Sequence, residues 1–227
     1  MKYNNITEGI FLDRPNRFIA YAEIDGKVEM VHVKNTGRCK ELLKKGVKVY
    51  LQRSDNPKRK TKYDLISVYK ADKLINIDSQ APNKIGFELI NRIFDVKYIK
   101  SECKYKKSRF DFYFETENEK AYLEVKGVTL EENGVVMFPD APTERGVKHI
   151  KELIELKKEG YGAYILFVIQ MNGIKYFTPN KKTHKEFAQI LKIAENEGVR
   201  ILAYDCIVSK DELICGNIVE YKSALID

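Results

Sequence analysis

Hydrophobic and polar positions follow two different rhythms along the chain, and the change falls near residue 80. In the first third, short segments rich in Val, Ile, Leu and Tyr are separated by turn sequences such as Asp25-Gly26, which is typical of β-strands. Strands are predicted over residues 6–12, 17–24, 28–33, 47–52 and 64–69, and one short helix over residues 38–45. Five short strands with one small helix suit a small barrel of the oligonucleotide-binding (OB) type.

From about residue 83 a helical period alternates with strands. Ile85, Leu89 and Ile93 share one helical face, whereas Phe110, Phe112 and Phe114 alternate as in a strand. The predicted order is α-β-β-β-α-β-α-β, with strands at residues 110–114, 121–125, 135–138, 163–169 and 200–204. Helical crossovers make the later strands parallel to a neighbour, so this order predicts a mixed sheet with helices on its faces. The sequence therefore predicts two domains, residues 1–78 and residues 79–227.

Composition excludes several classes of protein. The 227 residues are 44% hydrophobic and 32% charged, as in a globular chain rather than a disordered one. The longest apolar run, residues 163–169, is far shorter than the roughly 18 residues of a membrane span, and the first residues lack a signal segment. The four cysteines form no CxxC pair, so free, buried thiols are expected. A soluble cytoplasmic protein without a membrane partner is predicted.

Positive charge is concentrated in the first third of the chain. Residues 1–72 hold 16 Lys and Arg against 9 Asp and Glu, and the remaining residues hold 24 of each kind. A basic module attracts the phosphate backbone of a nucleic acid, and the alternative is a merely solvated lysine-rich surface. Residues 53–62 form a basic turn between Tyr50 and Tyr63. The candidate nucleic-acid contacts are Arg38, Arg53, Lys58, Arg59, Lys60 and Lys62, with Arg145 and Lys148 at the start of a later helix.

The predicted hairpin of residues 110–125 carries the candidate chemistry. Its strands are joined by residues 115–120, so opposed residues have numbers that sum to about 235. Asp111 and Glu124 meet this condition and are expected to face each other, on the face opposite the three phenylalanines. Lys126 points to the same face as Glu124 because side chains alternate along a strand.

Two carboxylates and a backbone carbonyl, that of Val125, provide oxygen ligands of the kind that Mg²⁺ or Mn²⁺ prefers. Such a cation would polarise a phosphoryl oxygen, and Lys126 would orient water or stabilise developing charge. The alternative is an ordinary cluster of acidic and basic side chains on a half-exposed sheet.

Several longer motifs resemble the sugar fermentation stimulation protein family, SfsA. They are residues 35–38, 53–61, 82–83, 108–112, 124–130 and 138–146, in the family's order, and the resemblance runs from near residue 8 to about residue 215. It implies an N-terminal OB barrel, a C-terminal domain of the PD-(D/E)XK (restriction endonuclease-like) type and DNA binding without sequence specificity. It also implies a catalytic set of Asp111, Glu124 and Lys126, with Glu88 as the helical acidic residue. Phe110 replaces the proline that gives the nuclease group its name.

Two functions from different classes follow. The first is a DNA-binding protein with a magnesium-dependent site that hydrolyses phosphodiester bonds, a candidate nuclease. The second is a DNA-binding regulator of sugar-utilisation genes, of the maltose type, without catalytic activity. RNA as the ligand and a homodimer stay open, because a basic barrel tracks either backbone.

Three further positions receive an interpretation from the sequence. Thr143 is the predicted N-cap of a helix from about residue 144 to residue 158. Gln170 ends the apolar strand, either holding water or a phosphate or serving only as a polar strand end. His149 and His184 are interpreted as surface or packing residues.

Overall fold

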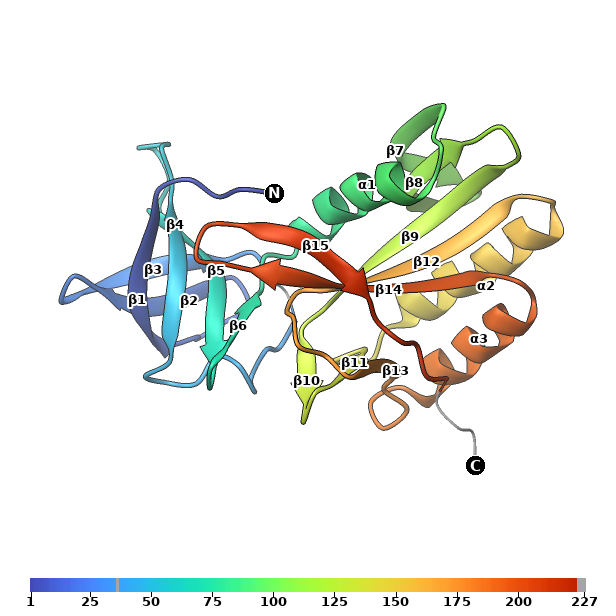
Figure 1. Ribbon diagram of the computed structural model, residues 1–227. Helices are drawn as coiled ribbons and strands as arrows, with labels where there is room; N and C mark the ends of the chain where they lie inside the picture. The colour runs from blue at the N-terminus through green and yellow to red at the C-terminus, as the bar shows by residue number, and fades with distance from the viewer. Residues whose placement is uncertain (36, 224–227) are drawn as a thin grey trace.

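The computed structural model describes residues 1–35 and 37–223, which form two units side by side (Figure 1). The first contains only strands, and the second is a mixed sheet with helices on both faces. A small three-stranded sheet lies near their junction. Within the described ranges, no helix is long and apolar enough to cross a membrane.

The N-terminal unit is a closed barrel of five strands. The strands are β1 (Ile6–Asp13), β2 (Ile19–Ile24), β3 (Lys27–Val33), β4 (Lys48–Arg53) and β5 (Tyr63–Lys70), and β6 (Lys73–Asn76) extends the sheet beside β5. Parallel pairing of β3 with β5 closes the ring. The OB-type barrel predicted from the sequence is confirmed, with every expected strand within a few residues of its predicted bounds. The helix predicted over residues 38–45 was wrong, because this segment consists of turns and irregular chain.

The C-terminal unit has α1 (Ala81–Ile93), α2 (Glu144–Lys158) and α3 (Lys185–Asn196) around a six-stranded sheet. Its strand order is β15-β14-β12-β9-β8-β7, from β7 (Tyr98–Tyr105), β8 (Ser108–Glu115), β9 (Lys120–Val128), β12 (Gly162–Ile169), β14 (Arg200–Val208) and β15 (Leu213–Ile218). A smaller sheet pairs β10 (Leu130–Glu132), β11 (Val135–Phe138) and β13 (Tyr176–Pro179). The predicted mixed sheet is confirmed, whereas β6, β7, β10, β13 and β15 were not predicted.

Strand β12 runs through the centre of the sheet and is buried along its whole length. Its alternate side chains enter two different cores: Leu166 and Val168 pack on the side of α1, whereas Ile165 and Phe167 pack on the side of α2 and α3. Burial on both faces explains why this segment is continuously apolar instead of alternating.

The first residues of the chain cross from the barrel to the second unit (Figure 1). The backbone N–H of Tyr3 donates to Asp211 O at 2.8 Å, and that of Leu213 donates to Met1 O at 2.9 Å. The ring of Tyr3 is buried in the core that contains α1 and β15. Residues 1–3 therefore belong spatially to the C-terminal unit.

Candidate metal centre and nucleic-acid surface

The hairpin of β8 and β9 has the register expected from the sequence. Phe112 pairs with Leu123 and Phe114 with Ala121. The pairing between the two strands ends at Phe112, so it stops short of the neighbouring Asp111. There the Asp111 carboxylate reaches across to β9, where its Oδ2 accepts a hydrogen bond of 2.7 Å from Val125 N. The expectation that the three phenylalanines share a face was wrong, because Phe110 lies in the core beside α2 once the pairing with β9 has ended.

Asp111 is held by two donors. Besides Val125 N, the side-chain amide of Asn83 donates to Asp111 Oδ1 at 2.9 Å from the first turn of α1. Burial raises the pKa of the Asp111 carboxyl, and the neighbouring Glu124 carboxylate raises it further. The two carboxylates therefore interact, as the predicted register requires.

Glu124 is almost fully buried, and only one of its two oxygens is hydrogen-bonded. Oε1 accepts from His149 Nδ1 at 2.6 Å and from Lys126 Nζ at 2.5 Å. Burial by itself would raise the pKa of Glu124, but the hydrogen bond from His149 and the charge of Lys126 outweigh it and lower the pKa. Oε2 is buried without a partner, although buried carboxylate oxygens normally have one.

The orphaned Oε2 and the adjacent Asp111 carboxylate fit a hard divalent cation. Such a cation takes carboxylate oxygens as ligands, and it would compensate both the missing partner of Glu124 and the repulsion between the two acids. When bound, it would supply Lewis-acid polarisation of a phosphoryl oxygen. Asp111 and Glu124 would hold it, while Lys126 contacts Glu124 from the same strand.

Glu88, the fourth member of the predicted catalytic set, is not brought to this position. Its carboxylate lies 3.4 Å from the amino group of Met1 and is half exposed. It lies five positions after Asn83, which places the two side chains about 140° apart around the helix. Among the described residues of α1, Asn83 is the one that contacts Asp111.

Sequence reasoning missed the role of His149. The packing alternative for His149 is confirmed, because the residue is buried on α2 with its ring 5.5 Å from the Phe110 ring, but its hydrogen bond to Glu124 was not predicted. Its position six residues after the N-cap Thr143 was the available signal, because the first two turns of α2 face the hairpin. The N-cap itself is confirmed: Thr143 Oγ1 accepts from Gly146 N at 3.1 Å.

A basic recess opens beside His149. It is lined by Lys104, Lys107, Ser108, Arg109, Glu144, Arg145, Lys148 and His149. The predicted contacts Arg145 and Lys148 are both exposed here, and Lys148 Nζ lies 3.8 Å from Glu152. Cations from β7 and β8 thus lie beside those at the start of α2, an arrangement that the sequence did not reveal.

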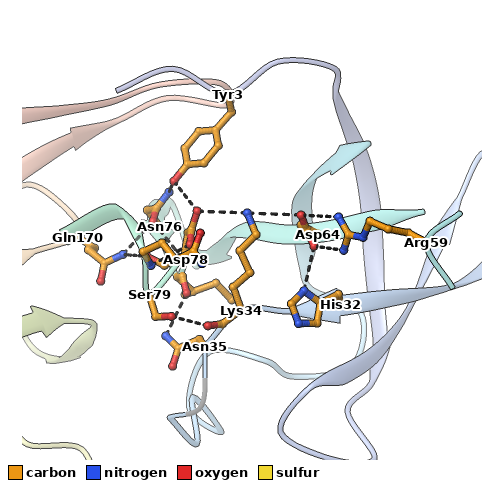
Figure 2. A network of polar contacts seen from close by, with 12 residues as sticks. Tyr3, His32, Lys34, Asn35, Arg59, Asp64, Asn76, Asp78, Ser79 and Gln170 are labelled. Atoms are coloured by element: carbon orange, nitrogen blue, oxygen red, sulfur yellow. Dashed lines mark hydrogen bonds and ion pairs between the residues drawn. The ribbon is translucent and has the colours of Figure 1, made fainter. Parts of the chain in front are cut away.

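The basic turn of the barrel is less uniform than its sequence suggests. Arg59 is turned inward onto buried Asp64, with contacts of 2.6 and 3.0 Å (Figure 2). Lys62 Nζ lies 3.4 Å from Glu29. Arg53, Lys58 and Lys60 are exposed, as is Arg38 at the other end of the barrel. The structure therefore assigns Arg59 a role in stabilising the barrel, which differs from the phosphate contact expected from the sequence.

Asp64 is the centre of a larger ion-pair cluster. Besides Arg59, it contacts His32 Nδ1 at 3.0 Å and Lys34 Nζ at 3.4 Å, and Lys34 also lies 3.7 Å from Asp78 (Figure 2). Burial opposes ionisation of Asp64, but the bonds from Arg59 and His32 prevail and lower its pKa to about 2.

Gln170 ties the two units together. Its amide nitrogen donates to Asn76 Oδ1 at 2.8 Å and to Asp78 O at 3.0 Å, while Asn76 Nδ2 donates to Tyr3 Oη at 3.0 Å (Figure 2). All these side chains are buried. Gln170 is therefore neither a simple polar strand end nor a residue whose amide nitrogen is available to a phosphate.

One cluster of three possible metal ligands occurs in the described ranges, namely Glu144, His184 and Glu186. His184 Nδ1 accepts from Thr143 N at 3.2 Å, so the ring proton of neutral His184 lies on Nε2, which faces Glu144 at 3.4 Å. Glu186 pairs with Lys151 at 3.0 Å. Because a metal would need an unprotonated Nε2, we assign no metal to this cluster. The four cysteines are free and buried, as expected.

Fold and site together define a two-domain protein in which an OB barrel is joined to a restriction endonuclease-like domain with a pair of interacting carboxylates. Two family models match it, "SfsA N-terminal OB domain" over residues 12–77 and "Sugar fermentation stimulation protein RE domain" over residues 80–212. The chain belongs to the sugar fermentation stimulation protein family, and the resemblance noted in the sequence is confirmed.

Relatives and a solved structure agree with this assignment. A "Sugar fermentation stimulation protein homolog" of Clostridium beijerinckii is 58% identical over 229 residues, covering 100% of both chains. One of Ruminiclostridium cellulolyticum is 60% identical over 213 residues, covering 92% of this chain and 94% of the relative. The structure of Pyrococcus furiosus SfsA in complex with Ca²⁺ has a TM-score of 0.87 at 30% identity and covers 98% of each chain.

Proposed function

We propose that the protein binds DNA without sequence specificity and hydrolyses phosphodiester bonds at a divalent metal centre held by Asp111 and Glu124. The observation that carries the proposal is the buried, unpartnered Oε2 of Glu124 beside the Asp111 carboxylate. The solved relative bound to Ca²⁺ supports a divalent cation in this family. We propose Mg²⁺ or Mn²⁺ for this chain, because either cation accepts carboxylate oxygens and also supports phosphoryl chemistry.

Different residues of the chain would hold the cation, orient its ligands and track the nucleic acid. His149 and Lys126 both bind Oε1 of Glu124, which leaves Oε2 for the cation. Asn83 and Val125 N orient Asp111. Lys126, which is partly exposed, would also stabilise negative charge that develops on the phosphate. Exposed cations on the barrel and beside His149 would track the backbone.

A regulator without catalytic activity is the second candidate. The names of the relatives favour it, because they describe stimulation of sugar fermentation and no hydrolysis. The position of Glu88 also favours it, because one residue of the expected nuclease set pairs with Met1 instead. In this case DNA binding would persist without cleavage.

Metal binding and cleavage are tested separately. Native protein, Asp111→Asn and Lys126→Ala are melted with Mg²⁺, Mn²⁺ or EDTA, and each is incubated with plasmid and single-stranded DNA. At a cation concentration ten times Kd, the native protein should gain about 1.4 kcal/mol of stability. Asp111→Asn should lose this gain and Lys126→Ala should keep it, while both lose cleavage.

Exposed Asp72 provides a matched control as Asp72→Asn, which should behave as the native protein does. Identical responses of native protein and Asp111→Asn to the cations would refute the metal centre. A cation response without cleavage of any DNA would favour the regulator.

A further inference from the structure

A cavity of about 350 Å³ lies between the barrel and the second unit, directly beside the candidate metal centre. Asn83 and Val125 line it, and these two residues donate the hydrogen bonds to Asp111. Asn35 and Gly37 of the barrel also line it. A group in this cavity would therefore be adjacent to a phosphate at the metal centre.

The lining of the cavity combines apolar and polar groups. Pro82, Met137, Phe138, Pro139 and Pro142 contribute apolar surface to it. The described lining residues include no Lys or Arg, and Asp140 is the one charged residue among them. The described lining is thus unsuited to a phosphate group, whereas its proline and phenylalanine side chains provide apolar surface for a planar ring.

Three side-chain groups that line the cavity have oxygen atoms that accept no hydrogen bond from the part of the chain that the structure describes. The Asp140 carboxylate, Asn83 Oδ1 and Gln170 Oε1 accept no hydrogen bond from any described residue, whereas the amide nitrogens of Asn83 and Gln170 are both engaged. Two glycines keep room for these oxygens. A Cβ at Gly37 would lie 2.8 Å from Asp140 Oδ2, and one at Gly127 would lie 2.7 Å from Gln170 Oε1.

We infer that the cavity receives one unstacked base of the bound strand, and that it favours guanine. A carboxylate that accepts two parallel N–H bonds matches the N1–H and N2–H₂ donors of guanine, and the proline and phenylalanine surfaces match its ring. Thymine lacks an amino group and offers a single donor. The inference rests on the proposed function, and it makes single-stranded or locally opened DNA the preferred substrate.

The test uses short oligothymidylates with one central position changed, in EDTA so that no cleavage occurs, and measures affinity by fluorescence anisotropy. A central guanine should raise the affinity about tenfold over thymine. Hypoxanthine, which lacks the N2 amino group, should lose most of this gain. The isosteric Asp140→Asn should bind all three oligonucleotides alike, and Asp72→Asn, at an exposed barrel turn, should retain the preference.

Four results would overturn the inference. A guanine preference that survives in Asp140→Asn, or equal binding of all three oligonucleotides by native protein, rejects the base pocket and leaves the proposed function intact. Failure of every oligonucleotide to bind rejects both. A Mg²⁺-dependent rise in melting temperature that Asp140→Asn abolishes and Asp111→Asn retains would assign the three acceptors to a cation.

Discussion

The buried carboxylate of Asp64 should make the stability of the barrel depend on pH in a measurable way. Its pKa is about 2 in the folded protein against a usual value of 3.8. Because the folded pKa is the lower one, the ionised carboxylate stabilises the native state above the unfolded pKa. This contribution is lost as the pH falls through both values.

The size of the effect follows from the shift. A lowering of about 1.8 pKa units corresponds to about 2.4 kcal/mol at neutral pH. Between about pH 6 and about pH 3, roughly 1.1 kcal/mol of this should disappear, because the unfolded carboxyl is mostly protonated at the lower pH and the folded one is not. Other acids titrate in the same range, so the native protein alone cannot isolate Asp64.

Comparison of the native protein with Asp64→Asn cancels the contribution of the other acids that titrate in the same pH range. The variant should be destabilised by about 3 kcal/mol or more at neutral pH, because Arg59 and Lys34 keep their charges and lose their partner. The difference in unfolding free energy between native protein and variant should shrink by roughly 1.1 kcal/mol at the lower pH. Urea unfolding followed by circular dichroism suits a chain without tryptophan. A difference that stays constant with pH would refute the role of Asp64.

Two further predictions concern the interface and the barrel turn. Gln170→Ala should lower the unfolding free energy by about 2–3 kcal/mol, because Asp78 O and Asn76 Oδ1 each lose a buried donor. Urea unfolding measures this change, with Gln189→Ala at an exposed position as the control. An equal loss of stability in both variants would contradict the prediction. Replacing Arg53, Lys58 and Lys60 by Ala should weaken DNA binding for all sequences alike and reduce the salt slope by roughly one for each phosphate that is no longer neutralised. A salt titration tests this, and an unchanged slope would move the binding surface elsewhere.

The sequence predicted best where local pattern and pairing determine the structure. The turn of residues 115–120 set the register of the β8–β9 hairpin, so the proximity of Asp111 and Glu124 followed from chain connectivity. Strand β12 was recognised because a strand buried on both faces is apolar throughout.

Interactions between distant segments were not predictable in this way. His149 reaches Glu124 across 25 positions, and Arg59 reaches Asp64 instead of solvent, because packing of whole elements decides both interactions. Edge strands such as β7 were missed because most of their side chains are exposed. Their sequences therefore lack the alternation of hydrophobic and polar residues that predicts a strand. Glu88 was wrongly expected at the metal centre. The resemblance to the family indicates an acidic residue on this helix, but it does not indicate which face of the helix carries that residue.

The docking of residues 1–3 onto the turn between β14 and β15 also has a consequence in time. Met1 and Tyr3 contact residues 211–213, which leave the ribosome long after residues 1–3. At about 5–20 residues per second, roughly 10–40 s of synthesis pass between the emergence of Tyr3 and that of its partners. The barrel strands can pair during this interval, but the aromatic ring of Tyr3 stays exposed to solvent until residues 211–213 have been synthesised. A nascent chain halted before residue 211 should therefore expose Tyr3 to proteases, whereas a chain that includes residues 211–213 buries this residue.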